Sequence, residues 1–198
     1  MKRNNIIVLS VLFAAFVSIP IGLNAYMHRQ QSIVSPSTAT SPPSGAIPAG
    51  YIPVSKQFTA PDFSLEEAGS DKVVHLQDPH RTKPVLFSFW ATWCGPCNEE
   101  LPHLQALYKK YGNQIDFYGV NSSDAPADVV KFANDNQLTF PMLSDTNRDA
   151  ATEYSVDAIP EMVLVSRTGN IVYIGSGFDP NMDTSLPPIL DAVIAQNA

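Results

Sequence analysis

The chain has 198 residues, with 19 acidic and 12 basic side chains and a formal net charge of −7 at neutral pH. This acidic balance argues against nucleic acid and anionic lipid as partners of the folded part. Only two cysteines are present, and the four histidines show no regular ligand spacing, so the sequence predicts no metal site.

The first 30 residues predict a membrane anchor or a signal segment. Lys2 and Arg3 precede an uncharged run from Ile6 to Leu23, which as a helix would span about 27 Å, close to the thickness of a bilayer core. Basic residues before the run predict a cytoplasmic N-terminus and a catalytic domain in the periplasm or another extracytoplasmic space. Leu23-Asn24-Ala25 is an imperfect cleavage site, which favours a single-pass anchor in the cytoplasmic membrane and leaves a cleaved signal as the alternative.

Residues 31–55 are rich in Pro, Ser, Thr and Ala and contain no charged side chain. Such a composition cannot bury a core, so we expect an extended linker. Residues 56–198 are then long enough for one domain with a core of its own.

Within that domain, the spacing of apolar and turn-forming residues predicts an α/β order: a hairpin, then βαβα, then ββα. The hairpin is expected from 60–65 and 73–76, and a buried central strand from 85–89. A helix is expected from Pro96 to about Tyr111, with Pro102 kinking it. The remaining elements are a strand over 115–120, a helix over 126–136 capped by Asp124 or Ala125, an extended piece over 140–143, a helical turn over 149–154, strands over 161–166 and 171–175 around a turn, and a last helix over 186–196 that opens on Pro187-Pro188.

Both cysteines lie in Trp93-Cys94-Gly95-Pro96-Cys97, where the central strand passes into the first helix. Two thiols at this spacing are typical of a reversible redox disulfide. Unpaired N–H groups at a helix N-terminus favour the thiolate of Cys94, which is the form that attacks other disulfides. A static disulfide is the less favoured alternative, because so short a loop removes little chain entropy.

A longer run resembles a known family. Residues 89–102 read FWATWCGPCNEELP, with Ala60-Pro61-Asp62-Phe63 upstream and Ile159-Pro160 downstream. From about Phe58 onward the chain resembles the membrane-anchored TlpA/ResA-like thiol-disulfide oxidoreductases of the thioredoxin superfamily. The resemblance implies a thioredoxin-like α/β fold: a central mixed sheet flanked by helices, with an extra N-terminal β-hairpin.

The resemblance also implies roles for individual residues. Cys94 corresponds to the exposed nucleophile and Cys97 to the more buried resolving thiol. Ile159 and Pro160 correspond to a cis-proline loop that docks the partner's backbone, although Pro160 read alone is also compatible with an ordinary turn proline. Trp93 is expected to shield the disulfide and to contribute to substrate binding.

Glu100 is the acidic residue that the pattern singles out. It follows Cys97 by three positions, so the two share a helix face, whereas Glu99 should face elsewhere. In ResA-like proteins a glutamate at this position is thought to assist proton movement at the thiols. The alternative is a first-turn acid that interacts with the helix dipole. Ser88 stands where cytosolic thioredoxins have a buried aspartate, which strengthens the case for Glu100.

These features predict an extracytoplasmic reductase of disulfide-bearing client proteins that needs no cofactor besides its Cys94–Cys97 disulfide. The Gly95-Pro96 pair of thioredoxin corresponds to a reducing potential of about −270 mV. In an oxidising compartment such a reductase needs a transmembrane electron donor, and the resemblance makes apocytochrome c one expected client.

Other functions stay open. One is a disulfide oxidase or isomerase, and another is a thiol peroxidase, because peroxiredoxins share the opening Ala60-Pro61-Asp62-Phe63. Against a peroxidase, Phe87 replaces the proline of the peroxidatic loop, and Thr92 lies two rather than three residues before Cys94. A copper-handling or redox-sensing module is the non-enzymatic alternative; copper chaperones of this fold use a longer cysteine spacing and a distant histidine, and the sequence shows no such pattern.

Overall fold

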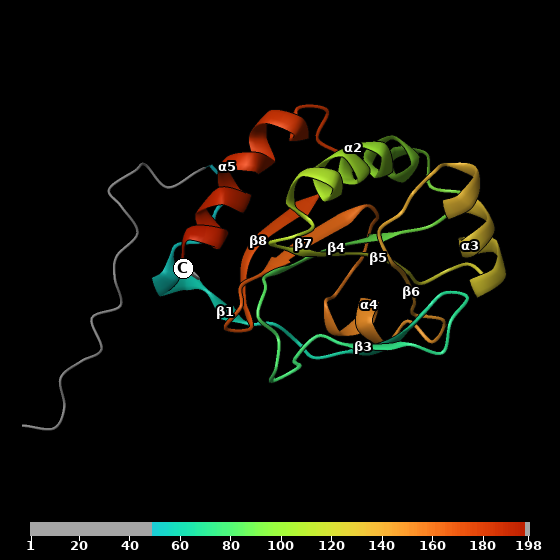
Figure 1. Ribbon diagram of the computed structural model, residues 1–198, viewed down its shortest axis with the longest axis horizontal. Coiled ribbons are helices and arrows are strands. Elements are labelled where there is room, and N and C mark those ends of the chain that lie inside the picture. Colours follow the sequence, from blue (N-terminus) through green and yellow to red (C-terminus); the bar gives the residue numbers. More distant parts are fainter. Residues whose placement is uncertain (1–48, 197–198) are drawn as a thin grey trace, which may run out of the picture. The chain divides into compact units, whose positions relative to one another are not determined.

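The computed structural model describes residues 49–196, so the predicted anchor or signal over 1–30 and most of the predicted linker lie outside the described residues. Strands β1 to β8 of this part form one mixed sheet in the order β1-β8-β7-β4-β5-β6-β2-β3 (Figure 1). The elements in chain order are η1 (Val54–Lys56), β1 (Phe58–Thr59), β2 (Ser64–Glu67), β3 (Val73–His75), β4 (Val85–Trp90), α2 (Gly95–Tyr111), β5 (Asp116–Asn121), α3 (Pro126–Asp135), β6 (Met142–Ser144), α4 (Asp149–Glu153), β7 (Glu161–Val165), β8 (Asn170–Ser176) and α5 (Met182–Ala195).

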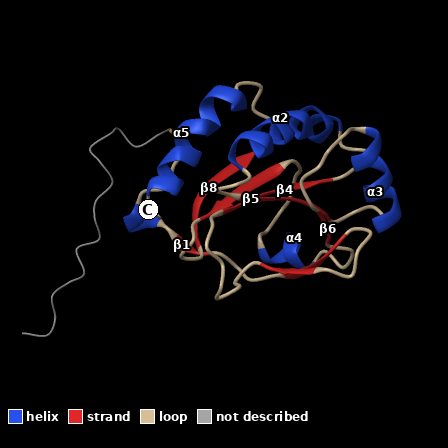
Figure 2. Cartoon of the chain, in the orientation of Figure 1, coloured by secondary structure: helices blue, strands red, loops and turns tan. Residues whose placement is uncertain are grey.

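β4 lies inside the sheet, between β7 and β5, and Figure 2 shows the strands of the sheet in red with helices on either side. It pairs in parallel with β5 and antiparallel with β7, and every one of its six side chains is buried. A continuous apolar run is typical of a strand covered on both faces, so the predicted central strand over 85–89 is confirmed.

Alternation along β4 divides the core into two layers. Leu86 and Trp90 point to one layer, together with the buried side chains of α2, α3 and α5. Phe87 and Phe89 point to the opposite layer, together with Ala151 of α4 and the buried side chains of the β2–β3 hairpin. Figure 1 shows α2 and α5 on one side of the sheet and α4 on the other.

The predicted hairpin is confirmed, since β2 and β3 pair antiparallel. β2 also pairs antiparallel with β6, so the hairpin extends the edge of the central sheet. The short strand β1 pairs with β8 at the other edge and was not predicted. Residues before 56 also belong to the folded domain, because the Tyr51 side chain is buried in the core and the Ile52 N–H donates to the Val172 carbonyl at 2.8 Å.

One predicted helix start was wrong, whereas the predicted start of α3 at residue 126, with Ala125 as one of its two predicted caps, is confirmed. The last helix begins at Met182 instead of 186, because Met182 is buried against the core and draws the preceding turn into the helix; Pro187 and Pro188 therefore lie inside it. The N-cap of α3 is Ala125, because the Asp124 carboxylate bonds to other groups. None of the helices in the described part is both long and apolar enough to span a bilayer.

Candidate active site

The two sulfurs are joined in a disulfide at the N-terminus of α2, with an S–S distance of 2.02 Å. Cys94 is the N-cap of the helix, and its Sγ accepts the Cys97 N–H at 3.2 Å. Cys94 is 4% exposed and Cys97 is fully buried. The more accessible sulfur is therefore Cys94, as predicted, but the expectation of an exposed residue is wrong, because in this oxidised form Cys94 packs within the apolar core.

The loop before β7 lies beside the first sulfur. The Ile159-Pro160 peptide bond is cis, and the Ile159 carbonyl oxygen lies 3.8 Å from Cys94 Sγ. Pro160 is buried, and its carbonyl accepts the Gly177 N–H at 2.8 Å. The structure thus brings the Cys94–Cys97 pair next to the Ile159-Pro160 pair. The two pairs are separated by at least 62 positions in the sequence.

The loop between β4 and α2 is fixed by one carboxylate. Asp124 accepts hydrogen bonds from the Thr92 N–H, the Thr92 hydroxyl and the Asn121 side-chain amide, each at 2.8 Å. Burial raises the pKa of Asp124, but these hydrogen bonds outweigh it and leave the pKa below its ordinary value. Sequence reasoning saw Asp124 only as a helix cap, and missed its contact with a loop 32 residues away.

Glu100 lies on the buried face of α2 and is 2% exposed, whereas its neighbour Glu99 is exposed to solvent. The fully buried Ser88 hydroxyl donates to Glu100 Oε1 at 2.5 Å. Burial raises the pKa of Glu100 to about 7, although the Ser88 hydrogen bond and His103 act in the opposite direction. Ser88 therefore has a partner that the sequence did not reveal; the signal was a single hydroxyl in an otherwise apolar strand.

A small cavity connects Glu100 with the surface segment after β8. It has a volume of ≈10 Å³ and is lined by Glu100 together with Tyr173, Gly177 and Asp179. Apolar side chains of Met162, Met182 and Leu186 complete the lining, and the volume is at the lower limit for a single water molecule.

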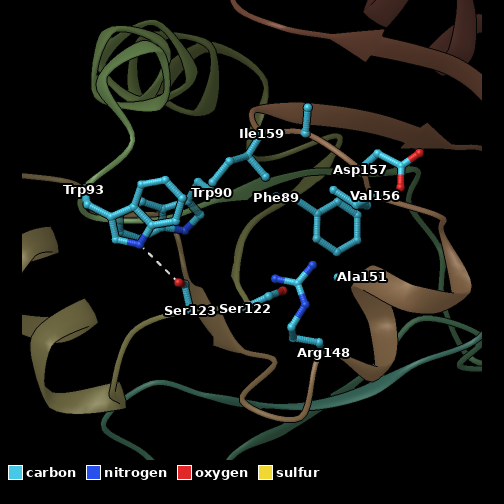
Figure 3. Close-up of a pocket in the computed structure, with 11 residues that line it drawn as sticks. Phe89, Trp90, Trp93, Ser122, Ser123, Arg148, Ala151, Val156, Asp157 and Ile159 are labelled. Atoms are coloured by element: carbon cyan, nitrogen blue, oxygen red, sulfur yellow. Dashed lines mark hydrogen bonds between the residues drawn. The ribbon is translucent and has the colours of Figure 1, made fainter.

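A larger groove runs along the opposite side of the 156–159 loop (Figure 3). Its volume is ≈130 Å³. Trp93 and Ile159 form two of its walls. The Trp93 side chain is 69% exposed, and its indole N–H donates to the Ser123 hydroxyl at 3.1 Å. Phe89 lies in the floor, and Arg148 reaches in from the start of α4. Cys94 does not line the groove, but two of the lining residues adjoin it: Trp93 precedes it in the chain, and the Ile159 carbonyl lies 3.8 Å from its Sγ.

Groups of three or more His, Cys, Asp or Glu side chains that could hold a metal ion do not occur among the described residues.

Comparison with known proteins gives a consistent result. The AhpC/TSA family model matches residues 57–174. The thiol-disulfide oxidoreductase ResA of Geobacillus kaustophilus is 34% identical over 60% of this chain and 68% of its own, and ResA of Bacillus subtilis is 32% identical over 67% and 73%. A crystal structure assigned to the thiol:disulfide interchange protein DsbE of Chlorobium tepidum has a TM-score of 0.64 at 28% identity, covering 70% of this chain and 96% of that one. The predicted thioredoxin-like fold is confirmed.

The Asp124 contacts predict a measurable loss on substitution. In Asp124→Asn one acceptor oxygen becomes a donor facing the Thr92 and Asn121 donors, which should lower the free energy of unfolding at pH 7 by about 1–2 kcal/mol. Because the folded-state pKa of Asp124 is lowered, its contribution is present above the ordinary carboxyl pKa and is lost as the pH falls through the lowered value. Urea unfolding at pH 7 and at pH 3 measures both effects. Asp71→Asn, in an exposed turn, is the control, and an equal loss there would contradict the assignment.

The burial of Glu100 predicts the opposite pH dependence. With a pKa raised from 4.5 to about 7, the folded protein holds a proton that the unfolded chain releases, so stability falls as the pH rises between these values. The fall corresponds to about 3 kcal/mol. Glu100→Gln should lack this fall, so its stability relative to the parent increases from pH 4.5 to pH 7 and then levels off. Urea unfolding of the oxidised protein tests this, with Glu99→Gln as the matched control.

Proposed function

Because the chain belongs to the AhpC/TSA family and, within it, to the ResA-like thiol-disulfide oxidoreductases, we propose that this oxidoreductase acts as a reductase of protein disulfides outside the cytoplasm. The observation that supports the proposal most directly is the position of Cys94 Sγ, which lies at the helix N-terminus and 3.8 Å from the Ile159 carbonyl. A client chain lying along the Ile159-Pro160 loop would bring its disulfide to that sulfur.

In the first step the Cys94 thiolate attacks one sulfur of the client disulfide. A mixed disulfide forms between Cys94 and the client, and the other client sulfur leaves as a thiolate. The N-terminal N–H groups of α2 stabilise the attacking thiolate before the reaction, and the Cys97 N–H already points at that sulfur.

In the second step Cys97 attacks the Cys94 sulfur. The Cys94–Cys97 disulfide forms, the second client thiolate is released, and two electrons have passed from the enzyme to the client. Cys97 is fully buried and must lose its proton before it can attack. Glu100, one helical turn further along the same buried face, has a pKa of about 7 and accepts that proton at neutral pH.

The direction of electron flow follows from the residues between the cysteines. Gly95-Pro96 is the pair found in thioredoxin, whose potential is about −270 mV, below the poise of oxidising compartments. Reduced enzyme must therefore be regenerated, and we propose a transmembrane electron donor for this. The predicted N-terminal anchor would hold the domain beside that donor, and the family resemblance supports apocytochrome c as a client.

The direction can be measured as an equilibrium potential against glutathione. We expect a value near about −270 mV, whereas a value near about −120 mV would make the protein an oxidase. In cells, Cys97→Ala should accumulate mixed disulfides with clients, because the resolving thiol is missing, and Cys94→Ala should accumulate none. Rapid peroxide consumption by the purified protein would instead favour a peroxidase.

The role of Glu100 predicts a change in the pH profile of the second step. In the parent, resolution of a mixed disulfide should accelerate as Glu100 loses its proton near pH 7. Glu100→Gln should lack this inflection and resolve more slowly at neutral pH, on the order of 10²-fold. Stopped-flow measurement with a peptide mixed disulfide on Cys94 isolates the step. A parental rate and profile for Glu100→Gln, with Glu99→Gln also unchanged, would exclude the proton role.

A further inference from the structure

The groove lined by Trp93 and Ile159, the two neighbours of Cys94, has an apolar floor and one cationic group. Phe89, Ala151 and Val156 line it and are themselves buried in the core, so the floor is rigid. Arg148 is exposed and extends into the groove from the N-cap position of α4 (Figure 3). Its guanidinium makes no hydrogen bond or ion pair with any described residue.

No described carboxylate forms an ion pair with Arg148, and two acids near it, Asp145 and Asp157, are engaged elsewhere or turned away. The buried Asp145 carboxylate accepts the Ser122 hydroxyl at 2.7 Å and the backbone N–H groups of Ala150 and Ala151 at 3.1 and 3.0 Å. Asp157 lies on the far rim of the groove, with its carboxylate pointing away from the guanidinium in Figure 3. The positive charge of Arg148 is thus available to a molecule in the groove.

The backbone supports a specific placement of this side chain. Arg148 has φ of +60°, in the left-handed region that residues with a Cβ rarely adopt. Its N–H donates to the Asp145 carbonyl at 2.9 Å and its carbonyl accepts the Thr152 N–H at 2.9 Å, so the conformation is held at both ends. Unusual backbone held in this way is found most often at functional positions.

We propose that the groove selects client segments that place an acidic side chain near the reactive cysteine, with Arg148 as the specificity-determining residue. An apolar client residue packs between Trp93 and Ile159, and a client carboxylate pairs with the guanidinium, which can bind it with two parallel hydrogen bonds. The proposal rests on the reductase function, since it concerns which disulfides reach Cys94. The occupant is an extended polypeptide segment of the client.

The selectivity is expected to be moderate and sensitive to salt. The sequence from residue 49 to residue 196 has 19 acidic and nine basic side chains, so the domain as a whole repels acidic clients. A single cation at the groove therefore changes which part of a client approaches Cys94 more than it changes overall attraction. For an exposed ion pair the rate should change about two- to fivefold, and the difference should shrink at high ionic strength.

The test uses reduced full-length protein and a set of peptides with one internal disulfide. The peptides differ only in a single Glu, Gln or Lys placed two to five residues from the first cysteine. For the parent, kcat/KM should be about two- to fivefold higher for Glu than for Gln at one or more positions, and lowest for Lys. Arg148→Gln should remove this preference, Arg148→Glu should reverse it, and Arg148→Lys should retain part of it.

Two controls separate this proposal from the reductase function. Arg167→Gln removes an exposed cation in the β7–β8 turn and should leave the preference unchanged. Hydroxyethyl disulfide is neutral and too small to fill the groove, so all variants should reduce it at the parental rate. Failure of the parent to reduce it would overturn the reductase function. Parental reduction of it with no difference among Glu, Gln and Lys peptides, or an unchanged preference in Arg148→Gln, would overturn the role of Arg148 alone.

Discussion

The site depends on one junction, where the buried strand β4 passes into α2 within four residues. Ala91 is fully buried at the end of the strand, and Thr92 is bound through both its N–H and its hydroxyl to Asp124. Cys94 can then serve as the helix N-cap with its sulfur facing the Cys97 N–H. Because Asp124 follows β5, the position of the sulfurs is set by the central parallel strand pair, and the reactive group does not rely on a free loop for its placement.

A buried carboxylate beside this junction reduces stability above its ordinary pKa, and in the proposed mechanism this cost accompanies its role as proton acceptor. In the core of a protein a glutamate is rarely retained for packing, and here burial raises its pKa towards neutrality. A carboxyl with an ordinary pKa would be a poor acceptor for a thiol proton at pH 7, whereas Glu100 is balanced between its two forms. Ser88 moderates the cost, because its hydroxyl gives the carboxylate one hydrogen bond inside the apolar layer.

The sequence predicted the elements whose signals are local and missed those that depend on distant partners. β4 and α2 followed from an apolar run and from Pro96 beside Cys97, and the hairpin turn before Asn170 followed from Gly169, whose φ is +83°. The pairing of β1 with β8 and of β2 with β6 leaves no trace in the pattern of either strand. The contacts of Asp124 and Ser88 were missed for the same reason: each is made across the sheet or between layers, to a residue distant in sequence.

The alternation of β4 also separates two tasks. Ser88 points to the layer of α2, where it meets Glu100, while Phe89 points to the layer of α4, where it forms the floor of the groove that holds Arg148. In the proposed mechanism, successive residues of one strand therefore support proton transfer on one face and client docking on the other, and Cys94 follows the end of that strand. Ile159 packs against both layers, but no hydrogen bond or ion pair among the described residues joins Arg148 to Glu100, so a change of charge in the groove is expected to leave the Ser88–Glu100 hydrogen bond intact. Client choice can in this way vary without altering the chemistry of the disulfide.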